Sequence, residues 1–185
     1  MLRESLVADP SVTKTPEFRR DYRRYWRMNA ARLPDIFYDR YFDLLSTCLR
    51  ESSTDIALIA RQISDPDGEN HGLQYSFASK LAHTVDPRIP VFDSFIASFY
   101  FFVPPASDRP FADRLADLIG FQEFLKREYA RVIDGRLLAP AIAYFRFRAE
   151  MPTWVPDQRV IDWLLWAWVS LLRNGAQHRG QALYK

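Results

Sequence analysis

The amino-acid sequence predicts an all-α protein, a compact orthogonal helical domain of about eight helices. The chain of 185 residues is 48% hydrophobic and 15% aromatic, which is enough apolar material for one large core. It contains only 6 glycines, and no valine- and threonine-rich stretch alternates between apolar and polar residues as strands do. Apolar residues instead recur three and four positions apart in successive segments, which is the period of amphipathic helices.

The helices are predicted in order from their start and stop signals. Thr15-Pro16-Glu17 is typical of a helix start, because a hydroxyl caps the first turn, proline fits the first position and an acid favours the N-terminus. Aromatic residues then follow on one face of that first helix. Comparable signals predict seven further helices: between Pro34 and Ser52, between Asp55 and Asp65, from Tyr75 to Val85, between Asp93 and Pro104, between Pro110 and Gly135, across residues 137–149, and between Asp157 and Asn174.

The domain organisation predicted from these elements is simple. Residues 1–13 form an irregular arm, residues 14–175 a single helical domain and residues 176–185 a tail. The N-terminus lacks an apolar signal core and no apolar run is long enough to span a membrane, so we expect a cytoplasmic protein without a membrane partner. The single cysteine, Cys48, excludes an internal disulfide and a cysteine-rich metal site. No cofactor or metal is expected, and nothing in the sequence indicates the oligomeric state.

A cluster of basic residues marks the first predicted helix. Residues 14–32 hold seven basic and two acidic side chains, a local charge of +5 within a chain whose net charge is +2. Such a cluster indicates an anionic partner better than the overall charge does, and DNA is the partner we expect. A solvated face on a packed helix is the alternative interpretation. The candidate nucleic-acid-binding residues of this helix are Arg19, Arg20, Arg23, Arg24 and Arg27.

The strongest functional signal lies between residues 73 and 102. Lys80 falls within an apolar helical run, Pro87 and Pro90 bound a short turn, and Asp93 opens the next apolar run. A charge inside apolar surroundings is costly unless it is paired or used. We therefore treat Lys80 and Asp93 as candidate catalytic residues, and a salt bridge joining the two helices is the structural alternative.

The residues around this turn resemble a known family. Ser79-Lys80, His83, Pro87, Pro90 and Asp93-Ser94 are similar to the core of the helix-hairpin-helix DNA glycosylases, and closest to uncharacterised bacterial proteins with an 8-oxoguanine DNA glycosylase-like fold. The likeness covers about thirty residues. This segment departs from the family in lacking the two hairpin glycines that approach a DNA phosphate, and the chain lacks the cysteines that bind a cluster in some members.

The resemblance implies a role for each of these residues. Lys80 would attack the sugar C1′ as the base leaves, and Asp93 would stabilise positive charge on the sugar and assist proton transfer. Ser79, His83 and Ser94 would contact nucleic acid. Aromatic rings would stack on the extruded base, and the candidates are Tyr75, Phe77 and Phe92, with Phe95 and Tyr100 as further rings that such a pocket would admit.

Each of these roles has a structural alternative. The aromatic rings at helical spacing would equally form plain core. His83 would serve as a hydrogen-bond donor to the turn backbone, as an acid–base group or as a base contact, and the first role is the commonest for a histidine in such a place. At the level of function, the alternative to an excision enzyme is a non-catalytic helical module that keeps the fold and binds nucleic acid or protein.

Overall fold

The all-α prediction is confirmed by the structure, a computed structural model that describes Leu6, residues 9–64 and residues 72–173. These residues form eight α-helices and two short 3₁₀-helices, and none of them forms a strand. In chain order the elements are η1 (Pro10–Lys14), α2 (Pro16–Tyr25), η2 (Met28–Ala31), α3 (Asp35–Glu51), α4 (Ile56–Ile63), α5 (Tyr75–Val85), α6 (Ser94–Phe99), α7 (Phe111–Asp134), α8 (Ala139–Arg148) and α9 (Asp157–Arg173).

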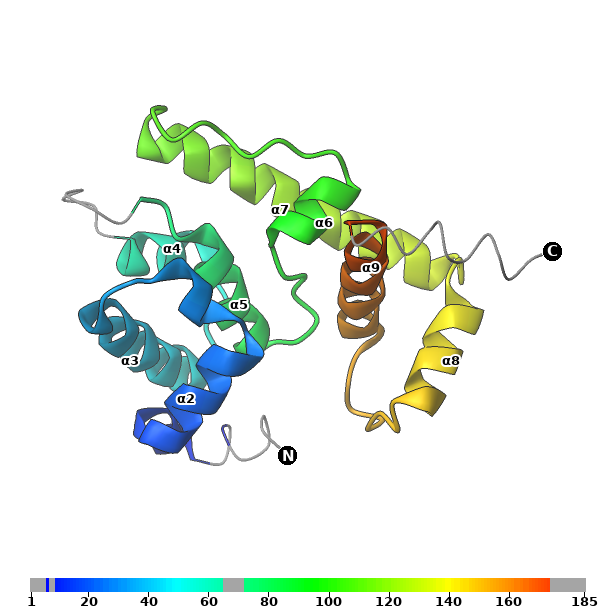
Figure 1. The fold of residues 1–185 in the computed structure, drawn as a ribbon, viewed down its shortest axis with the longest axis horizontal. Coiled ribbons are helices and arrows are strands. Elements are labelled where there is room, and N and C mark those ends of the chain that lie inside the picture. The colour runs from blue at the N-terminus through cyan, green and yellow to red at the C-terminus, as the bar shows by residue number, and fades with distance from the viewer. Residues whose placement is uncertain (1–5, 7–8, 65–71, 174–185) are drawn as a thin grey trace.

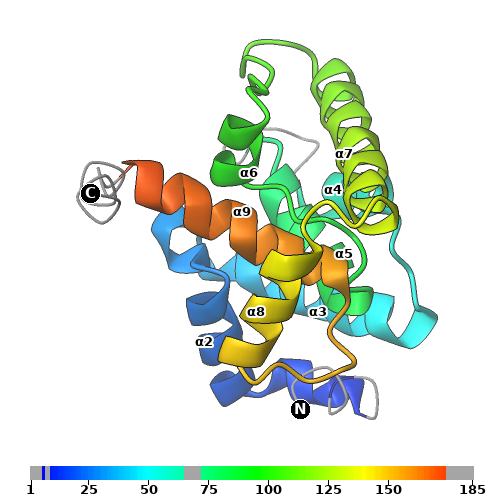
Figure 2. The same ribbon diagram turned by 90° about the vertical axis from the view of Figure 1, so that its right-hand side faces the viewer.

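The helices divide into two groups, which are joined by the connection from α5 to α6 (Figure 1). In the first group, α4 packs against both α3 and α5, and η1 packs on α3. In the second, α9 packs against α6, α7 and α8. The long α7 also contacts α4, and Figure 2 shows α9 crossing in front of the helices of the first group. None of the described helices is long and apolar enough to cross a membrane.

Side-chain caps set several helix starts where the sequence predicted them. The Thr15 hydroxyl accepts a hydrogen bond from the Phe18 amide at the start of α2. Asp55 caps α4 through the Leu58 amide, and Asp93 caps α6. These polar side chains accept from amides that have no partner inside their own helix.

The N-terminal arm is shorter than the sequence indicated. We expected residues 1–13 to be irregular, but residues 10–14 form the helix η1, and its Thr13 side chain is fully buried. Asp9 caps this short helix through the Ser11 amide, which is a local signal that the prediction did not use. Residues 1–5, 7–8 and the predicted tail at 176–185 lie outside the described part of the chain.

The core is built around α3 and α5. Tyr41 and Phe42 on α3 and Leu81 on α5 are completely buried. Cys48 is buried on α3 as a small core residue. The rings of α3 contact one another and those of α2 edge to face, which is a favourable geometry for aromatic pairs.

The connection between α5 and α6 contains a buried, extended segment that pairs with no strand. Backbone groups in such a place must find other partners. Here buried side chains from three helices are the hydrogen-bond partners of the backbone, one for each of residues 89–92. His83 of α5 donates to the Ile89 carbonyl at 2.6 Å and Gln122 of α7 donates to the Pro90 carbonyl at 2.6 Å. The Val91 amide donates to Asp162 of α9 at 3.4 Å, and the Phe92 amide donates to Ser79 of α5 at 3.0 Å.

Ser79 is therefore expected to stabilise the fold by holding this segment. Replacing Ser79 with alanine leaves the buried Phe92 amide without an acceptor, so the free energy of unfolding should fall by about 1–3 kcal/mol. Urea denaturation measures this change. Ser98→Ala is the matched control, because Ser98 is an exposed serine on α6, and its stability should stay within about 0.5 kcal/mol of wild type. Equal effects of the two substitutions would contradict this account.

Candidate active site

The two candidate catalytic residues line one pocket, which we call the Lys80 pocket. It has a volume of about 460 Å³ and lies between the end of α2, the middle of α5, the start of α6 and the face of α9. Lys80, Asp93 and Ser94 line it, together with Arg27. The sequence prediction that these residues share a site is therefore matched by their positions. The pocket also takes side chains that the sequence analysis did not single out: Trp26, Arg159, Asp162, Trp163 and Trp166.

Lys80 reaches this pocket from the face of α5 that also carries the partly buried Ser76 and Thr84. Its side chain is half-buried, and its Nζ lies 5.3 Å from the centre of the Phe77 ring. Burial lowers the pKa of Lys80, and the nearby Asp93 charge opposes that shift. Among the described residues Nζ has no hydrogen bond or ion pair, so the salt bridge considered as an alternative does not form. A lowered pKa increases the neutral fraction, the form in which an amine is nucleophilic.

Asp93 is held in place by the helix that it caps. Its Oδ1 accepts hydrogen bonds from the Phe95 and Ile96 amides at 2.8 and 2.9 Å. Both bonds fall on one oxygen, so the other carboxylate oxygen has no partner within the described residues. The aspartate is thus oriented by the first turn of α6 while one oxygen stays available to the pocket that it shares with Lys80.

A second carboxylate, Asp162 of α9, lies at the inner end of the Lys80 pocket. Only 4% of this side chain is exposed. The Tyr129 hydroxyl donates to its Oδ1 at 2.7 Å, and Arg159 lies 3.7 Å from its Oδ2. Burial raises the pKa of Asp162 to about 7, although Arg159, Tyr129 and the Val91 amide each favour the charged form. The group is therefore poised between its neutral and charged forms near neutral pH.

Arg159 and Asp162 had a weak signal in the sequence. They stand three positions apart, a spacing at which helix residues are neighbours, within a helix that is otherwise rich in apolar residues. Arg159 is 8% exposed and lies against the rings of Trp26 and Trp163, at 4.8 and 4.5 Å from their centres. A buried charge pair in an apolar helix is a marker for a site, but only the fold shows that it faces Lys80.

Two arginines stack on aromatic rings that line the Lys80 pocket. Arg27 lies 4.6 Å from the centre of the Trp166 ring, and Arg173 lies 4.3 Å from that of Phe95. The two rings are themselves 5.2 Å apart. Flat rings with guanidinium groups on them present both a stacking surface and positive charge. Phe95 was among the further rings considered from the sequence, whereas Trp166 was missed because its partners come from α6 and from the start of η2.

Several expected contacts are placed elsewhere by the structure. Ser79 is fully buried and holds the Phe92 backbone, so it cannot reach a nucleic acid at the surface. His83 donates to the Ile89 carbonyl, which confirms the backbone role considered for it. Tyr75, Phe77 and Phe92, the rings assigned to base stacking, are all in the core and none lines the Lys80 pocket. Their helical spacing reflected core packing, which is the commoner use of such rings.

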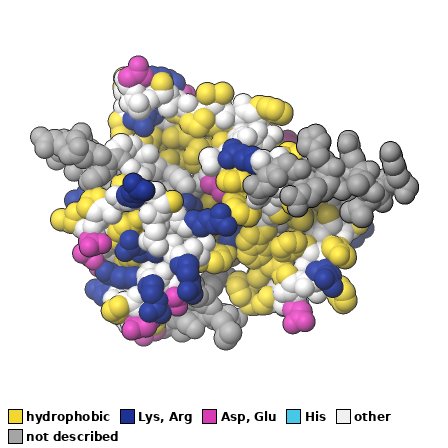
Figure 3. Space-filling model, in the orientation of Figure 1, with side chains coloured by type: hydrophobic (Ala, Val, Ile, Leu, Met, Phe, Trp, Pro, Cys, Tyr) yellow, Lys and Arg dark blue, Asp and Glu magenta, His cyan; other side chains and the backbone are white. Residues whose placement is uncertain are grey.

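The arginines of α2 have different surroundings. Arg19 is partly buried and forms an ion pair with Asp39 at 2.6 Å, so its charge is already used. Arg23 lies 3.7 Å from the centre of the Tyr38 ring and donates to Asn29. Arg20 and Arg24 are exposed and lie close to Asp21. Figure 3 shows basic side chains gathered on the face over α2. A basic surface exists there, and Arg27 connects it with the Lys80 pocket.

The described residues contain no group of three or more His, Cys, Asp and Glu side chains that is arranged to hold a metal ion. The comparisons with known proteins add no relative: no family model, no curated protein and no solved structure matches this chain.

Asp162 and His83 are both buried, and their shifted pKa values make the stability of the fold depend on pH in opposite directions. Asp162 has a folded pKa of about 7 against an ordinary value of 3.8, so the folded state holds the extra proton and stability falls as pH rises through this range. Burial and the charge of Arg159 lower the pKa of His83 from 6.5 to about 3. Between these two pH values the unfolded state binds a proton at His83 that the folded state does not bind, so stability rises with pH over this range.

We expect Asp162→Asn to leave the His83 contribution unopposed, since asparagine keeps an oxygen for the Tyr129 hydroxyl but does not titrate. From about pH 4 to about pH 6, the unfolding free energy of the variant should rise more steeply than that of wild type, by about 2 kcal/mol over the interval. Urea denaturation at several pH values measures both slopes. Parallel pH profiles for the two proteins would show that Asp162 is charged throughout.

Proposed function

We propose that this protein is a DNA glycosylase-like base-excision enzyme with Lys80 as nucleophile and Asp93 as the electrostatic and acid–base residue. The observation that carries the proposal is the position of Lys80. Its half-buried amine has no ion-pair partner within the described residues and lines the same pocket as an oriented carboxylate. An unpaired amine in such a place is costly for the fold alone, which favours a chemical use.

The residues suit the steps of base excision. The neutral Lys80 amine forms a bond to the sugar C1′ while the glycosidic bond breaks, and the departing base takes the bonding electrons. The Lys80 nitrogen becomes positively charged on forming this bond and releases a proton, which balances the proton that the base gains. Opening of the sugar ring then gives a Schiff base between Lys80 and C1′. The Asp93 carboxylate stabilises positive charge that develops on the sugar, and it acts more strongly where water is excluded. Asp162, with a pKa of about 7, is a second group able to hold or release a proton in the pocket.

The outer part of the pocket supports a nucleic-acid substrate. A base must leave the duplex stack before an enzyme can reach its sugar, and aromatic rings hold it outside the stack. Phe95 and Trp166 supply rings near Asp93, in place of the three core rings first considered. Arg27 and Arg173, stacked on these rings, supply positive charge for the flanking phosphates.

The base-excision proposal predicts a covalent adduct between the protein and DNA. Incubating the protein with DNA that contains an abasic site, in the presence of borohydride, should reduce the Schiff base and leave the protein attached to the DNA. Lys80→Ala should abolish this adduct, because Lys80 is the only lysine among the described residues that line the pocket. Denaturing gel electrophoresis with labelled DNA measures it.

Lys126→Ala is the matched control for this experiment. Lys126 is exposed on α7, where it pairs with Glu123, and its removal should leave the adduct intact. If folded wild-type protein forms no adduct, or if Lys80→Ala forms as much as wild type, Lys80 is not the nucleophile. If the protein releases a free base from damaged DNA but forms no adduct with abasic-site DNA, an excision reaction that depends on Asp93 alone remains.

The second candidate function is a non-catalytic module that binds nucleic acid. It is favoured by the exposed Arg20 and Arg24 on α2, neither of which lines the Lys80 pocket. Such binding neutralises phosphates and releases counterions, so it weakens steeply with salt.

Substituting both arginines with glutamine tests this surface. The slope of log affinity against log salt concentration should become shallower by about two, because each arginine would neutralise one phosphate. Fluorescence anisotropy with labelled DNA measures the slope. Lys80→Ala should change the slope by no more than about one, so that binding and adduct formation are separated. An unchanged slope in the double variant would show that Arg20 and Arg24 do not contact DNA phosphates.

A further inference from the structure

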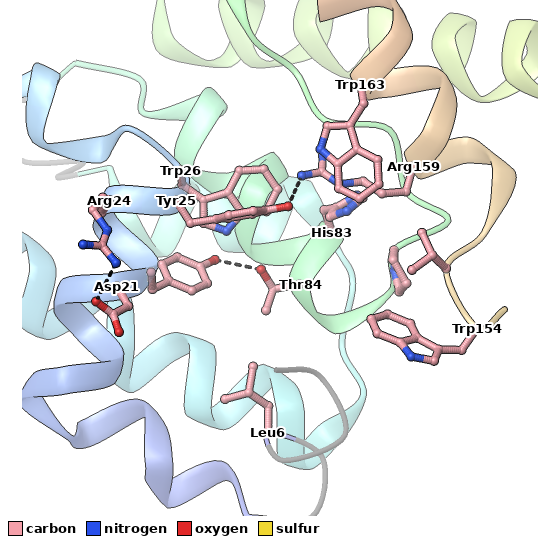
Figure 4. A pocket seen from close by; sticks show the side chains of 13 residues that line it. Leu6, Asp21, Arg24, Tyr25, Trp26, His83, Thr84, Trp154, Arg159 and Trp163 are labelled. Carbon is pink, nitrogen blue, oxygen red and sulfur yellow. Dashed lines mark hydrogen bonds and ion pairs between the residues drawn. The ribbon is translucent and has the colours of Figure 1, made fainter. Parts of the chain in front are cut away.

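A second pocket, which we call the aromatic pocket, lies beside the Lys80 pocket and has a volume of about 470 Å³. Figure 4 shows Tyr25, Trp26, His83, Arg159 and Trp163 gathered on one side of it, with Trp154 across from them. Four of these side chains, Tyr25, Trp26, Arg159 and Trp163, line both pockets and form the wall between them. The base-excision chemistry described above uses none of the residues that belong to the aromatic pocket alone.

One buried polar side chain of the aromatic pocket, that of His83, offers a hydrogen-bond acceptor. His83 is 5% exposed, and its Nδ1 lies 2.6 Å from the Ile89 carbonyl. A carbonyl oxygen only accepts, so Nδ1 carries the proton and Nε2 of the neutral ring has a free lone pair. Within the described residues Nε2 has no hydrogen-bond partner. Since burial and Arg159 lower the pKa of His83 to about 3, the ring stays neutral and Nε2 stays an acceptor at physiological pH.

Arg159 supplies donors next to this acceptor. Both residues line the aromatic pocket and lie against the same ring, because the Trp26 ring centre is 4.8 Å from the Arg159 guanidinium and 5.6 Å from the centre of the His83 ring. One of the Arg159 nitrogens donates to the Tyr25 hydroxyl and another lies 3.7 Å from Asp162. A guanidinium has five N–H donors, so Arg159 keeps donors for a ligand. Its charge is partly offset by Asp162, 3.7 Å away, and is covered by three rings, which reduces the need for an anionic ligand.

We propose that the aromatic pocket binds a neutral, planar heterocycle whose edge carries an N–H beside a carbonyl, as in hypoxanthine and guanine. The N–H would donate to His83 Nε2 and the carbonyl would accept from Arg159. The rings of Trp26, Trp154 and Trp163 would cover the faces of the heterocycle. A largely apolar pocket with a few converging polar groups is the usual form of a small-molecule site.

The need for a donor opposite His83 Nε2 and an acceptor opposite Arg159 makes the site selective. Adenine presents an acceptor ring nitrogen beside an amino donor, so it meets His83 and Arg159 only with its ring turned over, which points the ribose of adenosine in a different direction. Methylation of N1 of guanine removes the donor and adds bulk. A polar site that loses such a matched partner leaves buried groups unpaired and discriminates strongly against the altered ligand. A bidentate base contact contributes about 1–3 kcal/mol of discrimination, which is roughly a fivefold to hundredfold difference in Kd.

Isothermal titration calorimetry with free nucleosides tests the proposal on the full chain. Inosine and guanosine should bind, while adenosine and 1-methylguanosine should bind about tenfold more weakly or worse. Trp154→Ala and Trp166→Ala form a matched pair, because Trp154 lines only the aromatic pocket and Trp166 only the Lys80 pocket. Removal of a stacking ring should weaken inosine binding about fivefold or more in Trp154→Ala, and Trp166→Ala should bind as wild type does.

Three results would overturn this site: no heat of binding with inosine or guanosine at millimolar concentration, equal affinity for inosine and adenosine, or a loss of binding in Trp166→Ala that Trp154→Ala does not share. The selectivity among nucleosides is measured on the wild-type protein, so a variant that fails to fold does not decide the outcome. Lys80→Ala separates the site from base excision, since it should abolish the borohydride adduct and keep inosine binding.

Discussion

The structure depends on one constraint, the buried backbone of residues 89–92 that pairs with no strand. A carbonyl or amide buried without a partner costs about as much as a missing hydrogen bond. Four side chains from α5, α7 and α9 provide these partners, and each of them is itself buried. The helices before and after the connection are thereby fixed relative to each other. Lys80 in the middle of α5 and Asp93 at the start of α6 are placed on one pocket for this reason.

The same side chains link the fold to both pockets. Asp162 accepts from Val91 and lines the Lys80 pocket, and His83 donates to Ile89 and lines the aromatic pocket. Arg159 lies between them, where its charge favours the charged form of Asp162 and the neutral form of His83. Protonation of either group therefore affects backbone support and pocket chemistry together. This arrangement explains how two strongly perturbed titratable groups coexist in one small region.

The candidate site was predicted in part from sequence, and the reasons for success and failure are physical. Lys80 and Asp93 were found because each interrupts an apolar pattern across one short turn, which is a local signal. Ser79 was assigned a nucleic-acid contact through the family resemblance, and a serine beside Lys80 gives no local indication of how deeply it is buried. Tyr75, Phe77 and Phe92 were assigned to stacking because core rings and pocket rings have the same helical spacing. Trp166 and Asp162 were missed because their partners are far away in the chain.

By itself, the sequence determined the all-α class, most helix starts and the neighbourhood of Lys80 with Asp93. These depend on caps, prolines and apolar periodicity, which act within a few residues. The tertiary structure alone decided which face of α9 meets α5, and with it the Arg159–Asp162 pair, the stacked arginines and the wall between the two pockets. Interactions of that kind join residues up to 134 positions apart, so they depend on how the helices pack and no local sequence pattern specifies them.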